Sequence, residues 1–145
     1  MLEKNPFEIF SIPIQFSIDT AEVDRIFLEL QKLHHPDSPC PNAQKSLDVT
    51  RSYSCINSEI SRGEAILRIF NTPIDSINLP LGFIEKTFIM LEDGNVCEIN
   101  NNISELKKSL HAQGNITVQN IGNFAQTFIM YKYLTTTLKR LHGTR

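Results

Sequence analysis

The residues of this 145-residue chain that are best suited to chemistry lie close together in the first third of the sequence. They are two histidines, an aspartate and a cysteine: His34, His35, Asp37 and Cys40. Such side chains can ligate zinc or iron, and a cysteine near a histidine can act as a nucleophile. Adjacent histidines at a helix end point in different directions, however, and Cys40 lies in a stiff Pro-Cys-Pro turn. Metal binding therefore stays an alternative, while no catalytic residue, bound metal or cofactor is predicted because no orienting group or oxyanion site is indicated.

The tripeptide His35-Pro36-Asp37 in this segment has two interpretations. As a helix stop, its histidine suits the negative end of the helix dipole, its proline breaks the helix and its aspartate favours a turn. As a contact site, Pro36 stiffens the loop so that little entropy is lost on binding, while His35 and Asp37 offer a donor, an acceptor and charge. The elements around the tripeptide decide between the two.

The sequence before the tripeptide predicts two helices. The first begins at Asn5-Pro6 and ends at Pro13. The second begins at a capping box formed by Asp19 and Glu22 and runs to about His34. Its apolar residues recur at steps of three and four, which predicts one buried face: Val23, Ile26, Phe27, Leu30 and Leu33.

A loop over residues 38–42, with two prolines, separates this helix from a longer one that Asn42 should cap. The longer helix is predicted to be continuous to Asn71 because its stripe keeps a heptad-like spacing: Val49, Tyr53, Ile56, Ile60, Gly63, Leu67 and Phe70. Gly63 costs about 1 kcal/mol relative to alanine, which predicts close approach of another helix backbone. The two helices should form an antiparallel hairpin with the tripeptide at its tip.

The second half of the chain predicts three further helices. The first spans about residues 81–91 before Asp93-Gly94, the second runs from an Asn95 cap to Gly114, and the third begins near Thr117. Short connections favour an antiparallel three-helix bundle. The expected fold is therefore all-α, with an N-terminal domain over residues 1–73, a linker over 74–80 and a C-terminal bundle over 81–145.

Composition excludes several classes of partner. Fourteen Lys and Arg against sixteen Asp and Glu give a net charge of −2, so no strong attraction to nucleic acid or to a membrane is expected. Three cysteines fit neither a disulfide framework nor a CxxC metal knuckle. No continuous signal-peptide core or bilayer-length apolar run is present. We expect a cytoplasmic protein.

Residues 5–71, with their helix, triplet, loop and longer helix, resemble a J-domain. The resemblance implies that the triplet loop and basic residues of the preceding helix engage a seventy-kilodalton heat-shock chaperone, of the HscA or DnaK type, and promote its ATP hydrolysis. The residues with these implied roles are His35, Pro36, Asp37, Lys32 and Arg25.

A second resemblance narrows the class. The segments Ser54-Cys55-Ile56-Asn57 and Arg62-Gly63-Glu64-Ala65-Ile66-Leu67, followed by a helical bundle, look like the HscB type of J-protein, which is L-shaped and brings an iron-sulfur scaffold protein of the IscU type to its chaperone. The implied scaffold-binding patch comprises Phe83, Ile84, Phe88, Glu92 and Tyr133. The chain departs from the family pattern by being seven residues shorter between Asn57 and Arg62.

These resemblances predict a co-chaperone in iron-sulfur protein maturation that binds partners and is not an enzyme. The alternatives are a general J-domain co-chaperone with another client, a metal-binding protein using His34, His35 and Cys40, and a helical adaptor. The helix over residues 81–91 is apolar almost all round, so it either lies centrally in the bundle or reserves one face for a partner.

Overall fold

The computed structural model describes residues 5–143, which form seven α-helices and one short 3-10 helix. The elements are α1 (Pro6–Ile9), α2 (Thr20–His34), α3 (Ala43–Ile56), α4 (Glu59–Ile69), η1 (Ile74–Ser76), α5 (Phe83–Glu92), α6 (Val96–Ala112) and α7 (Ile121–Gly143). The described range contains no strand, only one isolated bridge between Gln15 and Asn115, so the all-α prediction is confirmed. No helix in this range has both the length and the apolar character needed to cross a membrane.

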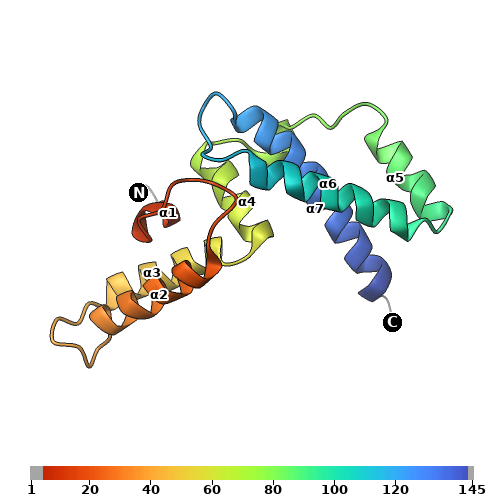
Figure 1. Ribbon diagram of the computed structural model, residues 1–145. Coiled ribbons are helices and arrows are strands. Elements are labelled where there is room, and N and C mark those ends of the chain that lie inside the picture. The colour runs from red at the N-terminus through yellow and green to blue at the C-terminus, as the bar shows by residue number, and fades with distance from the viewer. Residues whose placement is uncertain (1–4, 144–145) are drawn as a thin grey trace.

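The molecule has two arms, the α2/α3 pair and the α6/α7 pair, which extend from a common centre. Helices α2 and α3 pack as an antiparallel hairpin that projects to one side, while α6 and α7 pack along each other and point in a different direction (Figure 1). Helix α1 packs on α3, α4 packs on α7, and α5 packs on α6 at the far side of the bundle.

Side-chain caps begin three of the longer helices where the sequence predicted them. Asp19, Asn42 and Asn95 each accept a hydrogen bond from the backbone N–H three residues later. The Asn95 side chain also donates to Glu98 at 2.7 Å. These bonds satisfy N–H groups that have no partner inside the helix.

The prediction of one continuous helix over residues 43–71 is wrong. Helix α3 ends at Ile56, and Ser58 has an extended backbone with φ −126° and ψ 154° and caps α4 through its hydroxyl. The cause lies one turn later in Arg62, whose Nε donates to the Ile56 carbonyl at 3.0 Å. This guanidinium replaces the backbone N–H that a continuing helix would have supplied to the same carbonyl.

Arg62 also ties this break to the segment that leads into α2. Its Nη1 donates to the Phe16 carbonyl at 2.7 Å, and its guanidinium lies over the Phe16 ring at 5.6 Å from the centroid. Only 3% of Arg62 is exposed. Burial lowers the pKa of Arg62, and the nearby Glu59 carboxylate opposes that shift.

One core joins the two halves of the sequence. Phe16 is buried and makes ring contacts with residues of α6 and α7: His111, Phe124, Phe128 and Tyr131. Buried residues from α1 to α4 belong to the same cluster as these α7 residues. The Ile116 N–H donates to the Ile14 carbonyl at 2.8 Å, which adds a backbone link. Packing therefore joins the halves in addition to the connector over residues 74–80.

A polar contact reinforces the joint between α4 and the bundle. The Tyr131 hydroxyl donates to a Glu59 carboxylate oxygen at 2.7 Å, and Lys107 pairs with the other oxygen at 3.1 Å. Burial, together with the bond to Glu59, raises the pKa of Tyr131 to about 12. Burial raises the pKa of Glu59, but the contacts with Tyr131 and Lys107 outweigh it and the net shift is downward.

The prediction that another helix backbone approaches Gly63 is wrong, because its close neighbour is the side-chain ring of Phe128. A Cβ at this position would overlap the ring of Phe128, with Cε1 as its nearest atom. Glycine therefore permits α7 to place a fully buried aromatic side chain directly against α4.

Several predicted boundaries and a core position differ from the structure. Helix α1 ends at Ile9, before Pro13, because Ser11 adopts a left-handed conformation with φ 55°. Helix α7 begins at Ile121 because Asn120 accepts the Thr117 N–H at 2.7 Å in a preceding turn. Leu33, which the sequence assigned to the apolar face of its helix, is exposed near the end of α2.

We predict that Arg62→Ala lowers the free energy of unfolding by about 3 kcal/mol, because two buried carbonyls lose charged donors. Urea denaturation followed by circular dichroism measures the change. Arg51→Ala, at an exposed position on α3, is the control and should change stability by less than about 0.5 kcal/mol. A loss below about 1 kcal/mol for Arg62→Ala would contradict the structural role assigned to this side chain.

We further predict that Gly63→Ala destabilises the fold by about 1–3 kcal/mol because the added methyl overlaps the Phe128 ring. The matched control is Gly122→Ala in α7, where an added Cβ meets nothing within 4 Å. That substitution should leave stability unchanged or raise it by up to about 1 kcal/mol. Thermal unfolding of both variants provides the comparison, and equal shifts would rule out the contact as the cause.

Candidate docking surfaces

The tripeptide lies at the tip of the α2/α3 hairpin (Figure 1). His35 ends α2 by donating its backbone N–H to the Gln31 carbonyl at 2.9 Å, and its own carbonyl accepts the Ser38 N–H at 2.9 Å. The Asn42 N–H donates to the His34 carbonyl at 3.1 Å. These bonds close the loop across the end of the hairpin and hold the tripeptide outward.

The side chains of the tripeptide are open to solvent. The side chains of His35 and Asp37 are 59% and 92% exposed. The Asp37 N–H donates to Nδ1 of His35 at 3.1 Å. Nδ1 also lies 3.7 Å from a carboxylate oxygen of Asp37, so both contacts of the ring use this nitrogen, and Nε2 is the ring nitrogen that can donate to a partner. The loop therefore presents a donor beside a carboxylate.

A network that sequence reasoning missed fixes the hairpin just below the loop. The Gln31 amide donates to the Thr50 hydroxyl at 2.7 Å and accepts from the Ser46 hydroxyl at 2.7 Å. Further down, the Phe27 and Tyr53 rings stack with centroids 4.2 Å apart. The Gln31 partners are 15 and 19 residues away on another helix, so no local spacing could reveal them.

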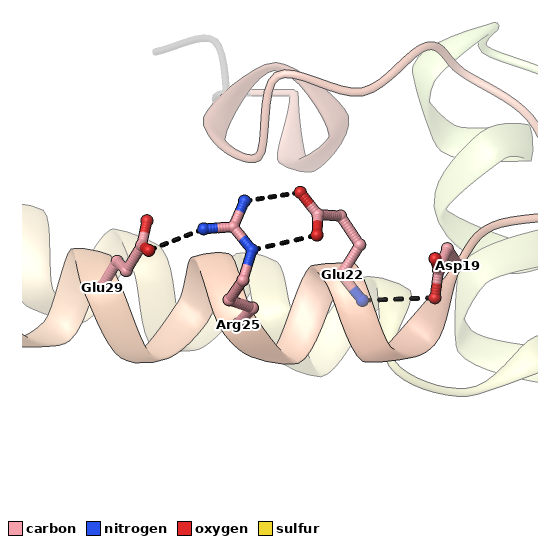
Figure 2. Close-up of polar contacts among 4 residues, drawn as sticks. All are labelled: Asp19, Glu22, Arg25 and Glu29. Carbon is pink, nitrogen blue, oxygen red and sulfur yellow. Dashed lines mark hydrogen bonds and ion pairs between the residues drawn. The ribbon is translucent and has the colours of Figure 1, made fainter.

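The two predicted docking cations differ in their surroundings. Arg25 lies between Glu22 and Glu29, and its contacts with them range from 2.5 to 3.0 Å (Figure 2). The hydrogen bond from Arg25 is the main reason that the pKa of Glu22 is lowered. Lys32 is exposed, and no ion pair involves it within the described residues.

Lys32 shares a shallow surface hollow with the tripeptide, whereas Arg25 does not. The residues that line this hollow are Leu28, Gln31, Lys32, His35, Asp37 and Ser38. The structure therefore brings together three of the predicted chaperone-contact residues on one surface, and Leu28, which is 59% exposed, adds an apolar contact that the sequence reasoning did not include.

The structure does not support the alternative hypothesis that this region binds a metal ion. In residues 5–143, no group of three or more His, Cys, Asp or Glu side chains is placed to hold a metal ion. Cys40 is exposed and carries a free thiol.

The residues of the predicted scaffold patch fall into two groups, one exposed on α5 and one packed between α5 and α7. Ile84 and Phe88 are 49% and 60% exposed on α5, and Glu92 follows at the same four-residue spacing, so all three lie on one face. Phe83 instead meets Tyr133 of α7 edge-on, with centroids 5.8 Å apart. Phe83 and Tyr133 therefore anchor α5 to the bundle.

Helix α5 lies at the edge of the bundle and keeps an apolar face in solvent. Its Thr87 is 1% exposed, whereas Ile89 is 55% exposed on another side of the helix from Ile84 and Phe88. Leu81, just before the helix, is fully exposed and was not predicted as part of the patch. Ile84 and Phe88 make an uncovered apolar surface on α5 of the kind that binds partners.

Several curated proteins are similar to part of this chain. The co-chaperone protein HscB homolog of Haemophilus ducreyi is 37% identical over 79 residues, which cover 49% of this chain and 45% of that protein. The homolog of Acinetobacter baylyi is 34% identical over 68 residues, which cover 45% of this chain and 40% of that protein. The homolog of Haemophilus influenzae is 36% identical over 73 residues, which cover 45% of this chain and 42% of that protein.

The matched region thus spans less than half the length of these curated relatives. No protein-family model matches the chain, and no solved structure matches it either. The similarity to several HscB homologues agrees with the resemblance drawn from the residues. Over about half of its length, this chain is similar to several HscB co-chaperone homologues.

Proposed function

We propose that this chain is a co-chaperone that stimulates the ATPase of a seventy-kilodalton heat-shock chaperone through its J-domain. The observation that carries the proposal is the exposed His35-Pro36-Asp37 loop. It lies at the tip of a hairpin whose two helices are joined by hydrogen bonds of Gln31. A rigid, displayed loop loses little conformational entropy on docking, so its donor and carboxylate can contribute fully to the interaction. The similarity to HscB co-chaperones supports the same role.

We also propose that residues 81–145 hold an iron-sulfur scaffold protein and deliver it to the chaperone, in support of iron-sulfur cluster assembly. The exposed α5 face, with Ile84 and Phe88 beside Glu92, supports this part of the proposal. A partner with an apolar surface and a neighbouring cation would complement that face.

In this mechanism the chain binds both partners and performs no bond chemistry itself. Docking of the loop favours the chaperone conformation that hydrolyses ATP, because a ligand shifts an equilibrium by its difference in affinity for the two states. Scaffold held on α5 at that moment meets the chaperone as it changes state, and this links capture to hydrolysis.

We predict that His35→Gln reduces stimulation of an HscA-type chaperone's ATPase at least tenfold, because the flexible glutamine amide does not hold a donor where the ring, fixed by its contact with the Asp37 N–H, places Nε2. Steady-state phosphate release with and without the chain measures it. The adjacent His34→Gln is the matched control and should remain within about twofold of the parent. Equal stimulation by His35→Gln and the parent would contradict the proposed mechanism.

We predict that Phe88→Ala weakens capture of an IscU-type scaffold protein by about tenfold, since roughly 1–2 kcal/mol is lost when a buried aromatic contact is removed from an interface. Isothermal titration calorimetry gives the affinity. Val118→Ala, an exposed apolar position in the turn between α6 and α7, should bind as the parent does. Unchanged binding of Phe88→Ala would assign the bundle to another client.

A further inference from the structure

The outer face of α2 carries a stripe of charges with alternating sign. Glu22, Arg25, Glu29 and Lys32 follow one another at steps of three, four and three residues, which places them along one face of the helix. All four residues are exposed. The stripe begins one turn after the Asp19 cap, and Figure 2 shows its first three residues, Glu22, Arg25 and Glu29. Its last residue, Lys32, lines the hollow beside the tripeptide.

The positive charge of Arg25 is already matched within the chain. Its guanidinium forms a two-point contact with Glu22, at 2.5 and 3.0 Å, and a third contact with Glu29 at 2.6 Å. Two carboxylates around one guanidinium leave a net charge of −1 at the centre of α2. No carboxylate pairs with Lys32 within the described residues. Lys32 is therefore the cation of this stripe whose charge is available to a binding protein.

An approaching surface therefore meets both signs on α2. A cluster of carboxylates opposite Arg25 would also face Glu22 and Glu29, and like charges repel as strongly as opposite charges attract. Arg25 could reach such a cluster only by exchanging its present partners. Exposed ion pairs of this kind shift an equilibrium by roughly 1.4- to 5-fold each, so two of them are enough to alter docking measurably.

We propose that Glu22 and Glu29 are specificity-determining residues of the chaperone-docking face and act by holding Arg25. By pairing with Arg25 they cancel its charge and so weaken docking to an acidic chaperone surface, which leaves Lys32 as the cation of this face that is free to contact the chaperone. The inference rests on the proposed function, because it takes α2 as part of the docking face.

A double-mutant cycle tests this inference. Four proteins are compared: the parent, Arg25→Ala, the pair Glu22→Gln with Glu29→Gln, and the triple variant. The half-saturating concentration for stimulating the ATPase of a purified HscA-type chaperone is measured at low and moderate ionic strength. We expect Arg25→Ala alone to change this concentration less than twofold, and the glutamine pair to lower it about three- to tenfold.

In the glutamine background, Arg25→Ala should reverse the gain, and added salt should weaken docking more steeply than in the parent because a free guanidinium now contributes. Equal effects of Arg25→Ala in both backgrounds would overturn the inference, as would a loss of affinity in the glutamine pair. Glu105→Gln is the matched control, since that exposed carboxylate pairs with Lys108 on α6, away from the hairpin.

Failure of the proposed function gives a different result. If the parent stimulates no better than His35→Gln, the chaperone role itself is wrong and the inference is lost with it. If the parent stimulates and His35→Gln does not, the cycle alone decides whether Glu22 and Glu29 act through Arg25. Far-ultraviolet circular dichroism of the four proteins confirms that α2 remains helical, because glutamine keeps nearly the same helix propensity as glutamate.

Discussion

The buried guanidinium of Arg62 is the contact on which the rest of this structure depends. It gives hydrogen bonds to the carbonyls of Ile56 and Phe16 and lies over the Phe16 ring. A buried charge is costly unless its donors are satisfied, and here the acceptors are backbone groups that lack other helical partners. One side chain thus fixes the end of α3, the start of α4 and the segment leading into α2.

The break that Arg62 stabilises determines the direction of both arms. A continuous helix over residues 43–71 would carry α4 straight on from the hairpin. Instead, α4 turns against α7, where Gly63 admits the Phe128 ring and Glu59 meets Tyr131. The hairpin is then free to project from the shared core, which is the geometry that exposes its tip (Figure 1).

Local contacts could be predicted from the sequence, and long-range ones could not. The caps at Asp19 and Asn95 were indicated by a glutamate three positions later, and the cap at Asn42 by its residue type at the end of a proline-containing loop. The helix break was missed because the apolar stripe runs through Asn57 and Ser58 without a change of period. Arg62 reaches a carbonyl 46 residues away, and no pattern along the chain indicates such a contact.

In the candidate sites, too, local features could be predicted from the sequence and long-range contacts could not. The exposed tripeptide could be predicted because proline and a helix end are local signals, whereas the bracing of the hairpin by Gln31 depends on a second helix. For the patch, spacing placed Ile84 and Phe88 on one face, but only the packing of Phe83 against Tyr133 separates the residues that contact solvent from those that anchor the helix.

The arrangement of the two surfaces bears on how the proposed function would operate. The hairpin tip and α5 lie at opposite ends of the molecule as seen in Figure 1, with the shared core between them. Two partners docked there would not compete for the same residues. Because the core joins the arms by packing, a chaperone bound at the tip and a scaffold held on α5 would be kept at a high effective concentration relative to each other. This would favour binding of the scaffold to the chaperone without any contact between the two docking surfaces.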